Sequence, residues 1–99
     1  MPLRIRRAIK ARRDQNELWL YIAANNVKAA DEQINRLHDA FYMLASYPDA
    51  GRLREEFGSN LRTFPVDHYL IFYRATPSVL EIVRIFHTGR QITPDMLED

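Results

Sequence analysis

The most regular pattern of apolar positions lies between residues 27 and 47. Apolar side chains recur there at spacings of three and four residues, which places them on one face of a helix: Val27, Ala30, Ile34, Leu37, Phe41 and Leu44. The helix is expected to stop before Pro48, because proline disfavours helical geometry in the residue that precedes it. The stretch therefore predicts a helix of about five turns.

A shorter stripe predicts a second helix earlier in the chain. Its members recur at spacings of four, three and four residues: Ala11, Gln15, Leu18 and Ile22. The pattern ends near Asn25 and Asn26. Because two helices joined by so short a turn pack antiparallel, we expect a helical hairpin.

Strand signals dominate the region from Leu61 to Arg90. Runs of aromatic and β-branched residues are bounded there by the turn formers at Asp67-His68 and at residues 75–78. They predict a meander of three strands, and alternating apolar and arginine positions in Leu3–Lys10 predict one strand before the helices. The expected order is β-α-α-β-β-β, an α+β fold with the helical hairpin packed on a mostly antiparallel sheet.

The remaining segments are predicted to be connections. Residues 48–52 are rich in turn formers, and residues 53–59 are a polar connection in which Phe57 is the expected anchor. Residues 92–99 form a short tail, with a helical turn expected to start at Thr93 or Pro94. At 99 residues, the whole chain, 1–99, is expected to be one domain.

Composition narrows the class of protein. The chain has no cysteine, which excludes disulfides and thiolate zinc sites, and it has no stretch approaching the ~20 apolar residues of a membrane span. We therefore expect a cytoplasmic protein without membrane contact. His38, His68 and His87 do not cluster along the sequence, so neither a metal nor another cofactor is expected.

Charge points to interaction surfaces. The net charge of +1 lacks the strongly basic balance of a dedicated nucleic-acid-binding protein. Arginine is nevertheless strongly preferred over lysine, which occurs only at Lys10 and Lys28. Arginine offers a rigid, weakly hydrated fork suited to interfaces, so this bias favours a binding surface.

The order of elements, together with residues at fixed places, resembles the ParE toxins of the RelE/ParE superfamily from bacterial toxin–antitoxin systems. The similarity covers nearly the whole chain, although Gln15 stands where a leucine is common in the family. It rests on Ala11, Asp14, Leu18, Tyr21 and Ala23 in the first helix, on Leu44, Tyr47, Pro48, Gly51 and Arg52 at the exit of the second, and on Leu61-Arg62, Tyr69, Ile71, Tyr73, residues 82–85, His87 and Arg90 in the strands.

The resemblance implies one of two activities. ParE-like toxins poison DNA gyrase and are neutralised by a ParD-like antitoxin, and DNA is contacted only indirectly, through that antitoxin. RelE-like toxins, the alternative, are ribosome-dependent mRNA endoribonucleases that need cations and a proton-transfer group at the scissile phosphate. Leu70 and Ile92 occupy positions where many of these ribonucleases carry arginine and tyrosine. The chain is therefore expected not to be an enzyme. A family member that has lost toxicity and survives as a binding module is a third interpretation.

Basic groups in and beside the predicted strands are the candidate target-binding residues: Arg62, Arg84, His87 and Arg90. Arg62 and Arg84 equally suit ion pairs within the chain, with Glu81 or Asp67 as partners. Apolar and aromatic residues along the helical seams are the candidate antitoxin-binding residues: Leu18, Trp19, Tyr21, Ile22, Phe41, Leu44 and Tyr47. These residues also suit core packing, most clearly Trp19 beside Leu18.

Overall fold

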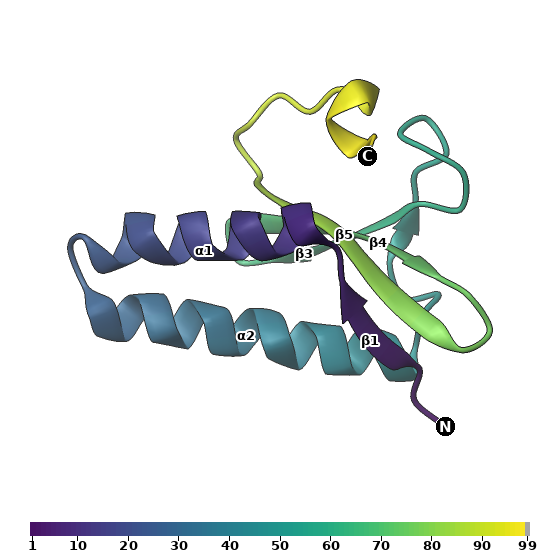
Figure 1. Cartoon of the computed structure of the whole chain (residues 1–99), viewed down its shortest axis with the longest axis horizontal. Helices are drawn as coiled ribbons and strands as arrows, with labels where there is room; N and C mark the ends of the chain where they lie inside the picture. The colour runs from purple at the N-terminus through teal and green to yellow at the C-terminus, as the bar shows by residue number, and fades with distance from the viewer. Residues whose placement is uncertain (99) are drawn as a thin grey trace.

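The structure is a computed structural model of the chain, and it describes residues 1–98. Its elements follow the predicted order, with one short strand added between the helices and the meander. They are β1 (Arg4–Arg7), α1 (Ile9–Ala23), α2 (Val27–Ser46), β2 (Arg52–Leu53), β3 (Arg62–Val66), β4 (Tyr69–Ala75), β5 (Val79–His87) and the 3₁₀ turn η1 (Pro94–Leu97). Figure 1 shows α1 and α2 side by side, with β1 at the end where α1 begins and α2 ends.

The five strands form one sheet in the order β1-β5-β4-β3-β2. Strand β1 runs parallel to β5, and every other neighbouring pair is antiparallel. The helical hairpin supplies the long connection that places β1 in a sheet made otherwise of consecutive strands. The predicted α+β fold, with a mostly antiparallel sheet, is confirmed.

The first strand ends earlier than predicted, and one short strand was not predicted. The first strand was expected to reach Lys10, but the chain leaves it at Ala8, whose carbonyl accepts the first helical hydrogen bond of α1 from Arg12 N–H. Strand β2 was not predicted, because its two residues carry no apolar pattern and are held only by pairing with Arg62 and Thr63. Strand β2 thus arises from tertiary pairing, which local sequence does not encode.

The helix boundaries follow side-chain chemistry. The Asn26 carboxamide caps α2 by accepting a hydrogen bond of 3.0 Å from Ala29 N–H. Helix α2 ends at Ser46, directly before Tyr47 and Pro48, as predicted. Helix α1 starts less favourably: Ala8 at its N-cap makes no side-chain cap, and its first turn contains no acidic residue.

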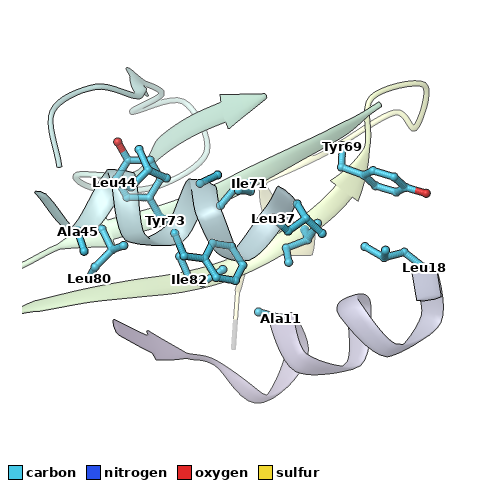
Figure 2. Close-up of a cluster of buried hydrophobic side chains, with 13 residues drawn as sticks. Ala11, Leu18, Leu37, Leu44, Ala45, Tyr69, Ile71, Tyr73, Leu80 and Ile82 are labelled. Atoms are coloured by element: carbon cyan, nitrogen blue, oxygen red, sulfur yellow. The ribbon is translucent and has the colours of Figure 1, made fainter. Parts of the chain in front are cut away.

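The main core lies between the helical hairpin and one face of the sheet. Figure 2 shows Leu37 and Leu44 from α2 packed against Ile71, Tyr73, Leu80 and Ile82 from the central strands, with Ala11 and Leu18 approaching from α1. The predicted helix seams are confirmed at Ala11, Leu18, Leu37 and Phe41, which are all buried. Val27 is an exception, because its side chain at the first position of α2 remains exposed.

A second apolar cluster lies on the opposite face of the sheet, since Phe72 alternates along β4 with the core residues Ile71 and Tyr73. It comprises buried Leu61, Phe72, Val83, Phe86 and Leu97, with Phe57, Leu70, Ile92 and Met96 packed around them. Phe57 meets Phe72 edge to face at 5.5 Å, which confirms its predicted anchoring role. The predicted C-terminal turn is confirmed as η1, and the final residue of the tail, Asp99, lies outside the described residues.

Candidate interaction surfaces

Arg84 is engaged inside the protein. Its guanidinium donates from Nε and Nη2 to the two carboxylate oxygens of Asp14, at 2.7 and 2.9 Å, and from Nη1 to the Met96 carbonyl at 2.8 Å. Asp14 accepts a third hydrogen bond from Ile85 N–H at 2.9 Å. The side chains are only 16% and 8% exposed. These bonds tie α1 to β5 and η1, and each of the three guanidinium nitrogens of Arg84 has a partner within the fold.

The sequence carries a signal for this pair in the position of Asp14. Asp14 lies three residues after Ala11 and four before Leu18, so it shares their buried helix face. An acidic side chain on such a face requires a buried donor, and Arg84 supplies it. The predicted partners were wrong: Glu81 instead lies 3.9 Å from Arg6, and Asp67 binds Arg36 at 2.6 Å.

Arg62 is also engaged, though less completely. Its Nη1 donates to the Gly51 carbonyl at 2.8 Å, and its Nη2 lies 3.5 Å from Asp49 Oδ1. The same loop is held by Tyr73, whose hydroxyl donates to the Pro48 carbonyl and accepts from Gly51 N–H. Arg62 therefore braces the exit of α2, while 27% of its side chain stays exposed.

His87 and Arg90 are exposed and lie together in a cleft of about 470 Å³ between α1 and the end of β5. We call this the His87 cleft. Its lining combines apolar and aromatic side chains with polar ones. The first group is Leu18, Tyr21, Tyr69, Ile85 and Phe86, and the second is Asp14, Glu17, His87 and Arg90. The Arg90 guanidinium stacks over the Phe86 ring at 5.1 Å. Of the four candidate target-binding residues, these two share one accessible hollow.

Local contacts fix the imidazole of His87. Its Nδ1 accepts a hydrogen bond of 3.0 Å from Gly89 N–H, and its carbonyl accepts one from Arg90 N–H. The His87 ring stacks on His68 at 6.2 Å and meets Tyr69 edge to face at 5.6 Å. Figure 2 shows the Tyr69 ring and Leu18 at the same end of the core, which forms the inner wall of this cleft.

The candidate antitoxin-binding residues do not form a single surface. Leu44 is fully buried, so we assign it to the core, and Leu18 and Phe41 expose only their edges, at 7% and 3%. Ile22 is half-buried against the core, and Trp19 donates from Nε1 to Asp31 at 2.8 Å across the helical hairpin. Only the Tyr21 and Tyr47 side chains are prominently exposed, at 78% and 68%.

A second cleft, of about 530 Å³, lies between β1 and α2. We call it the β1–α2 cleft. Its lining is apolar apart from Arg7 and His38: Pro2, Leu3, Ile5, Phe41, Tyr42 and Ala45 complete it. The sequence did not single out this hollow, because it depends on the parallel placement of β1 beside β5, which leaves one edge of β1 unpaired.

A hydrogen-bond chain through Gln15 joins Arg7 and His38, two of the residues that line the β1–α2 cleft. Arg7 Nη1 donates to Gln15 Oε1 at 3.0 Å, and Gln15 Nε2 lies 2.8 Å from His38 Nε2. Since the carboxamide oxygen accepts from Arg7, its nitrogen must donate, and His38 Nε2 must accept. The chain is therefore satisfied only when His38 is neutral. Burial and the nearby Arg7 charge lower the pKa of His38, against a weaker opposing effect of Asp39.

Within residues 1–98, no group of three or more histidine, cysteine or acidic side chains is arranged to hold a metal ion. None of the described helices combines the length and apolar character needed to cross a bilayer.

Solved structures place this architecture in a known class. The chain is similar to the chromosomal ParDE toxin–antitoxin system of P. aeruginosa, with a TM-score of 0.71 and 16% identity, over 86% of this chain and 95% of that one. It is also similar to the RelBE2 toxin–antitoxin complex of Mycobacterium tuberculosis, with a TM-score of 0.59 and 26% identity, over 88% and 99% of the two chains. The fold is that of the RelE/ParE toxins.

Sequence comparison identifies the branch. Residues 5–92 match the family described as the ParE toxin of the type II toxin–antitoxin system parDE, and the chain belongs to that family. It is 38% identical over 61 residues to Toxin ParE3 of Caulobacter vibrioides. That match covers 62% of this chain and 61% of the relative, so it spans less than two thirds of the relative's length.

Proposed function

We propose that this ParE-family chain binds DNA gyrase and thereby halts growth, and that a ParD-like antitoxin neutralises it. Its action is contact with the target, without catalysis. The observation that supports a non-catalytic action is that Arg84 donates hydrogen bonds to Asp14 and to the Met96 carbonyl. Because the carboxylate offsets the positive charge of the guanidinium, this pair can do little to stabilise a negatively charged phosphate.

The two apolar replacements support the same proposal. Leu70 and Ile92 pack against the second apolar cluster, beside Phe72, Phe86 and Leu97. Neither side chain can donate a hydrogen bond or transfer a proton. At these two positions the chain therefore supplies neither the cation nor the acid–base group that the ribonucleases of this scaffold carry there.

The His87 cleft is the proposed contact surface for gyrase. It combines two exposed features common at protein interfaces, an aromatic side chain at Tyr21 and an arginine at Arg90. Its arginine is stacked on Phe86, so less side-chain freedom is lost when a partner binds.

The β1–α2 cleft and the unpaired edge of β1 are the proposed surface for the antitoxin. The apolar lining offers burial, and the exposed Tyr42 at 68% offers an aromatic rim. Solved relatives of this fold are toxin–antitoxin complexes, which supports an antitoxin as the partner of this chain.

Expression of the chain without antitoxin tests the proposal. We expect growth arrest with DNA breaks and induction of the DNA-damage response, and we expect translated messages to persist. Rapid, codon-dependent loss of ribosome-bound messages before any DNA damage would instead support the ribonuclease alternative.

A pair of variants tests the contact surface. Arg90→Ala should weaken growth inhibition while changing stability by no more than about 0.5 kcal/mol, because its side chain is exposed. Arg52→Ala, at an exposed position in β2, is the matched control and should remain as toxic as the parent. If Arg90→Ala is as toxic as the parent at equal expression, this cleft is not the surface that contacts gyrase.

A further inference from the structure

Charge is divided unevenly along this chain. Residues 1–13 hold six of its 14 basic residues and none of its 13 acidic ones. The other residues therefore hold eight cations against 13 carboxylates. The small overall charge of +1 conceals a basic N-terminal segment attached to an acidic remainder.

The fold keeps most of these cations at the surface. Five of the six are exposed, and we call them the N-terminal basic cluster: Arg4, Arg6, Lys10, Arg12 and Arg13. The sixth, Arg7, is half-buried and faces the β1–α2 cleft. The cluster spans β1 and the first five residues of α1, which adjoin in Figure 1. At the usual rise per residue, this is a length of about 20 Å.

Several members of the cluster share one side of the molecule. Arg6, Lys10 and Arg13 line the same hollow beside η1. Arg4 lies two residues before Arg6 on β1, so it shares that strand face. Two carboxylates, Glu81 and Glu98, also line the hollow, so the cations outnumber but do not exclude negative charge there.

Pairing within residues 1–98 leaves the cluster largely uncompensated. Among residues 1–98, the one carboxylate within 4.0 Å of any member is that of Glu81, at 3.9 Å from Arg6. Lys10 donates to a neutral acceptor, the Glu98 carbonyl, at 2.6 Å. Lys10, Arg12 and Arg13 also occupy the start of α1, where the helix dipole disfavours cations and no acidic residue offsets them. The folded chain thus places these charges where they oppose its own stability.

We propose that the N-terminal basic cluster binds the phosphate backbone of duplex DNA. This goes beyond gyrase and antitoxin binding, neither of which requires the toxin to touch DNA, and it revises the expectation that DNA is contacted only through the antitoxin. Duplex DNA presents one charge per about 1.7 Å, or about 12 charges along the length of the cluster. Arginine forks bind such phosphates with two hydrogen bonds each.

Two observations favour duplex DNA over other polyanions. An acidic protein partner would need apolar anchors, yet Ile9 is the only large apolar side chain strongly exposed among residues 4–13. A single-stranded nucleic acid is usually held by stacking on aromatic side chains, and residues 1–13 contain none. A cluster of exposed cations without stacking groups suits a duplex read through its backbone.

Binding of the purified full-length chain to a fluorescent duplex of arbitrary sequence tests the proposal. With about four phosphate contacts, affinity should fall by about 100-fold between roughly 50 and 200 mM salt. The double variant Arg12→Glu, Arg13→Glu should bind at least about tenfold more weakly, with the slope of log affinity against log salt reduced by about two. Its melting temperature should not fall, because the new carboxylates suit the start of α1.

The control is the double variant Lys28→Glu, Arg52→Glu. It makes the same change in net charge at exposed positions outside the cluster, and one of them is also in the first turn of a helix. It should retain most of the affinity of the parent. Equal weakening of the two double variants would overturn the proposal, because binding would then follow net charge alone.

Three further outcomes would also overturn it: absence of binding at low salt, tighter binding to single-stranded RNA of equal charge, and displacement of the duplex by poly-glutamate at equal charge concentration. The last would point to an acidic protein partner. Loss of gyrase inhibition in cells would leave this result unaffected, since the assay contains only the chain and DNA.

Discussion

Removing the Asp14 carboxylate should lower the stability of the protein more than a substitution at the surface does. Asp14→Ala deletes a carboxylate that accepts three hydrogen bonds, two from Arg84 and one from Ile85 N–H, and it leaves a guanidinium that is only 16% exposed. Breaking one partner of such a buried pair costs about 3–5 kcal/mol. In a domain of this size, the melting temperature should fall by at least about 10 °C.

The double variant Asp14→Ala, Arg84→Met separates two quantities: the cost of leaving one buried charge unpaired, and the net contribution of the ion pair to the free energy of unfolding. It removes both charges and retains an apolar side chain beside Phe86, so we expect it to recover much of the loss seen in Asp14→Ala. Thermal and urea unfolding of the parent, both single variants and the double variant give the coupling energy. An Asp14→Ala cost below about 1 kcal/mol, or simple additivity of the two single changes, would refute a buried, coupled pair.

The same double variant also bears on mechanism. If the protein acts by contact through the His87 cleft, the folded double variant should still inhibit growth, because Arg84 does not line that cleft and the Asp14 side chain is only 8% exposed. A folded double variant without toxicity would restore Arg84 as a functional cation.

Three other outcomes are expected. Leu37→Ala removes a fully buried core side chain and should cost about 2–5 kcal/mol in urea unfolding. Gly51→Ala should cost about 1–3 kcal/mol in the same assay, because a Cβ there would collide with the Tyr73 hydroxyl and the Thr63 carbonyl. For His38 the folded-state pKa is lowered, so its contribution to stability is present above the unfolded pKa of about 6.5 and is lost as pH falls below it. His38→Gln should therefore reduce the difference in unfolding free energy between about pH 7.5 and pH 5.5, and an unchanged difference would contradict a neutral His38 in the native state.

Sequence predicts this fold where a single element carries its own pattern. The seam of α2 and the proline at its exit define the helix without reference to the sheet, and Asn26 is a preferred capping residue. The three meander strands are likewise bounded by short turns. Two features depend on distant partners, so no local pattern predicts them: the parallel pairing of β1 with β5 and the two-residue strand β2.

The candidate site was predicted only in part for a similar reason. Residue type identifies Arg62, Arg84 and Arg90 as chemically notable, but their roles depend on whether a carboxylate or carbonyl lies within reach. Asp14 is 70 residues from Arg84 in sequence, and Asp49 meets Arg62 only because the α2 exit folds against β3. In the structure, Arg62 and Arg84 are partly buried and bind partners within the fold, whereas Arg90 is exposed.

The position of β5 in the sheet has a consequence for when the protein can first act. It lies between β1 and β4, yet it is the last strand of this sheet to be synthesised. The N-terminal strand therefore has no neighbour until the C-terminal strand emerges from the ribosome, and the core under the helices stays incomplete until then. Both clefts depend on that core. Neither cleft can therefore form until the residues of β5 have been synthesised and have inserted between β1 and β4.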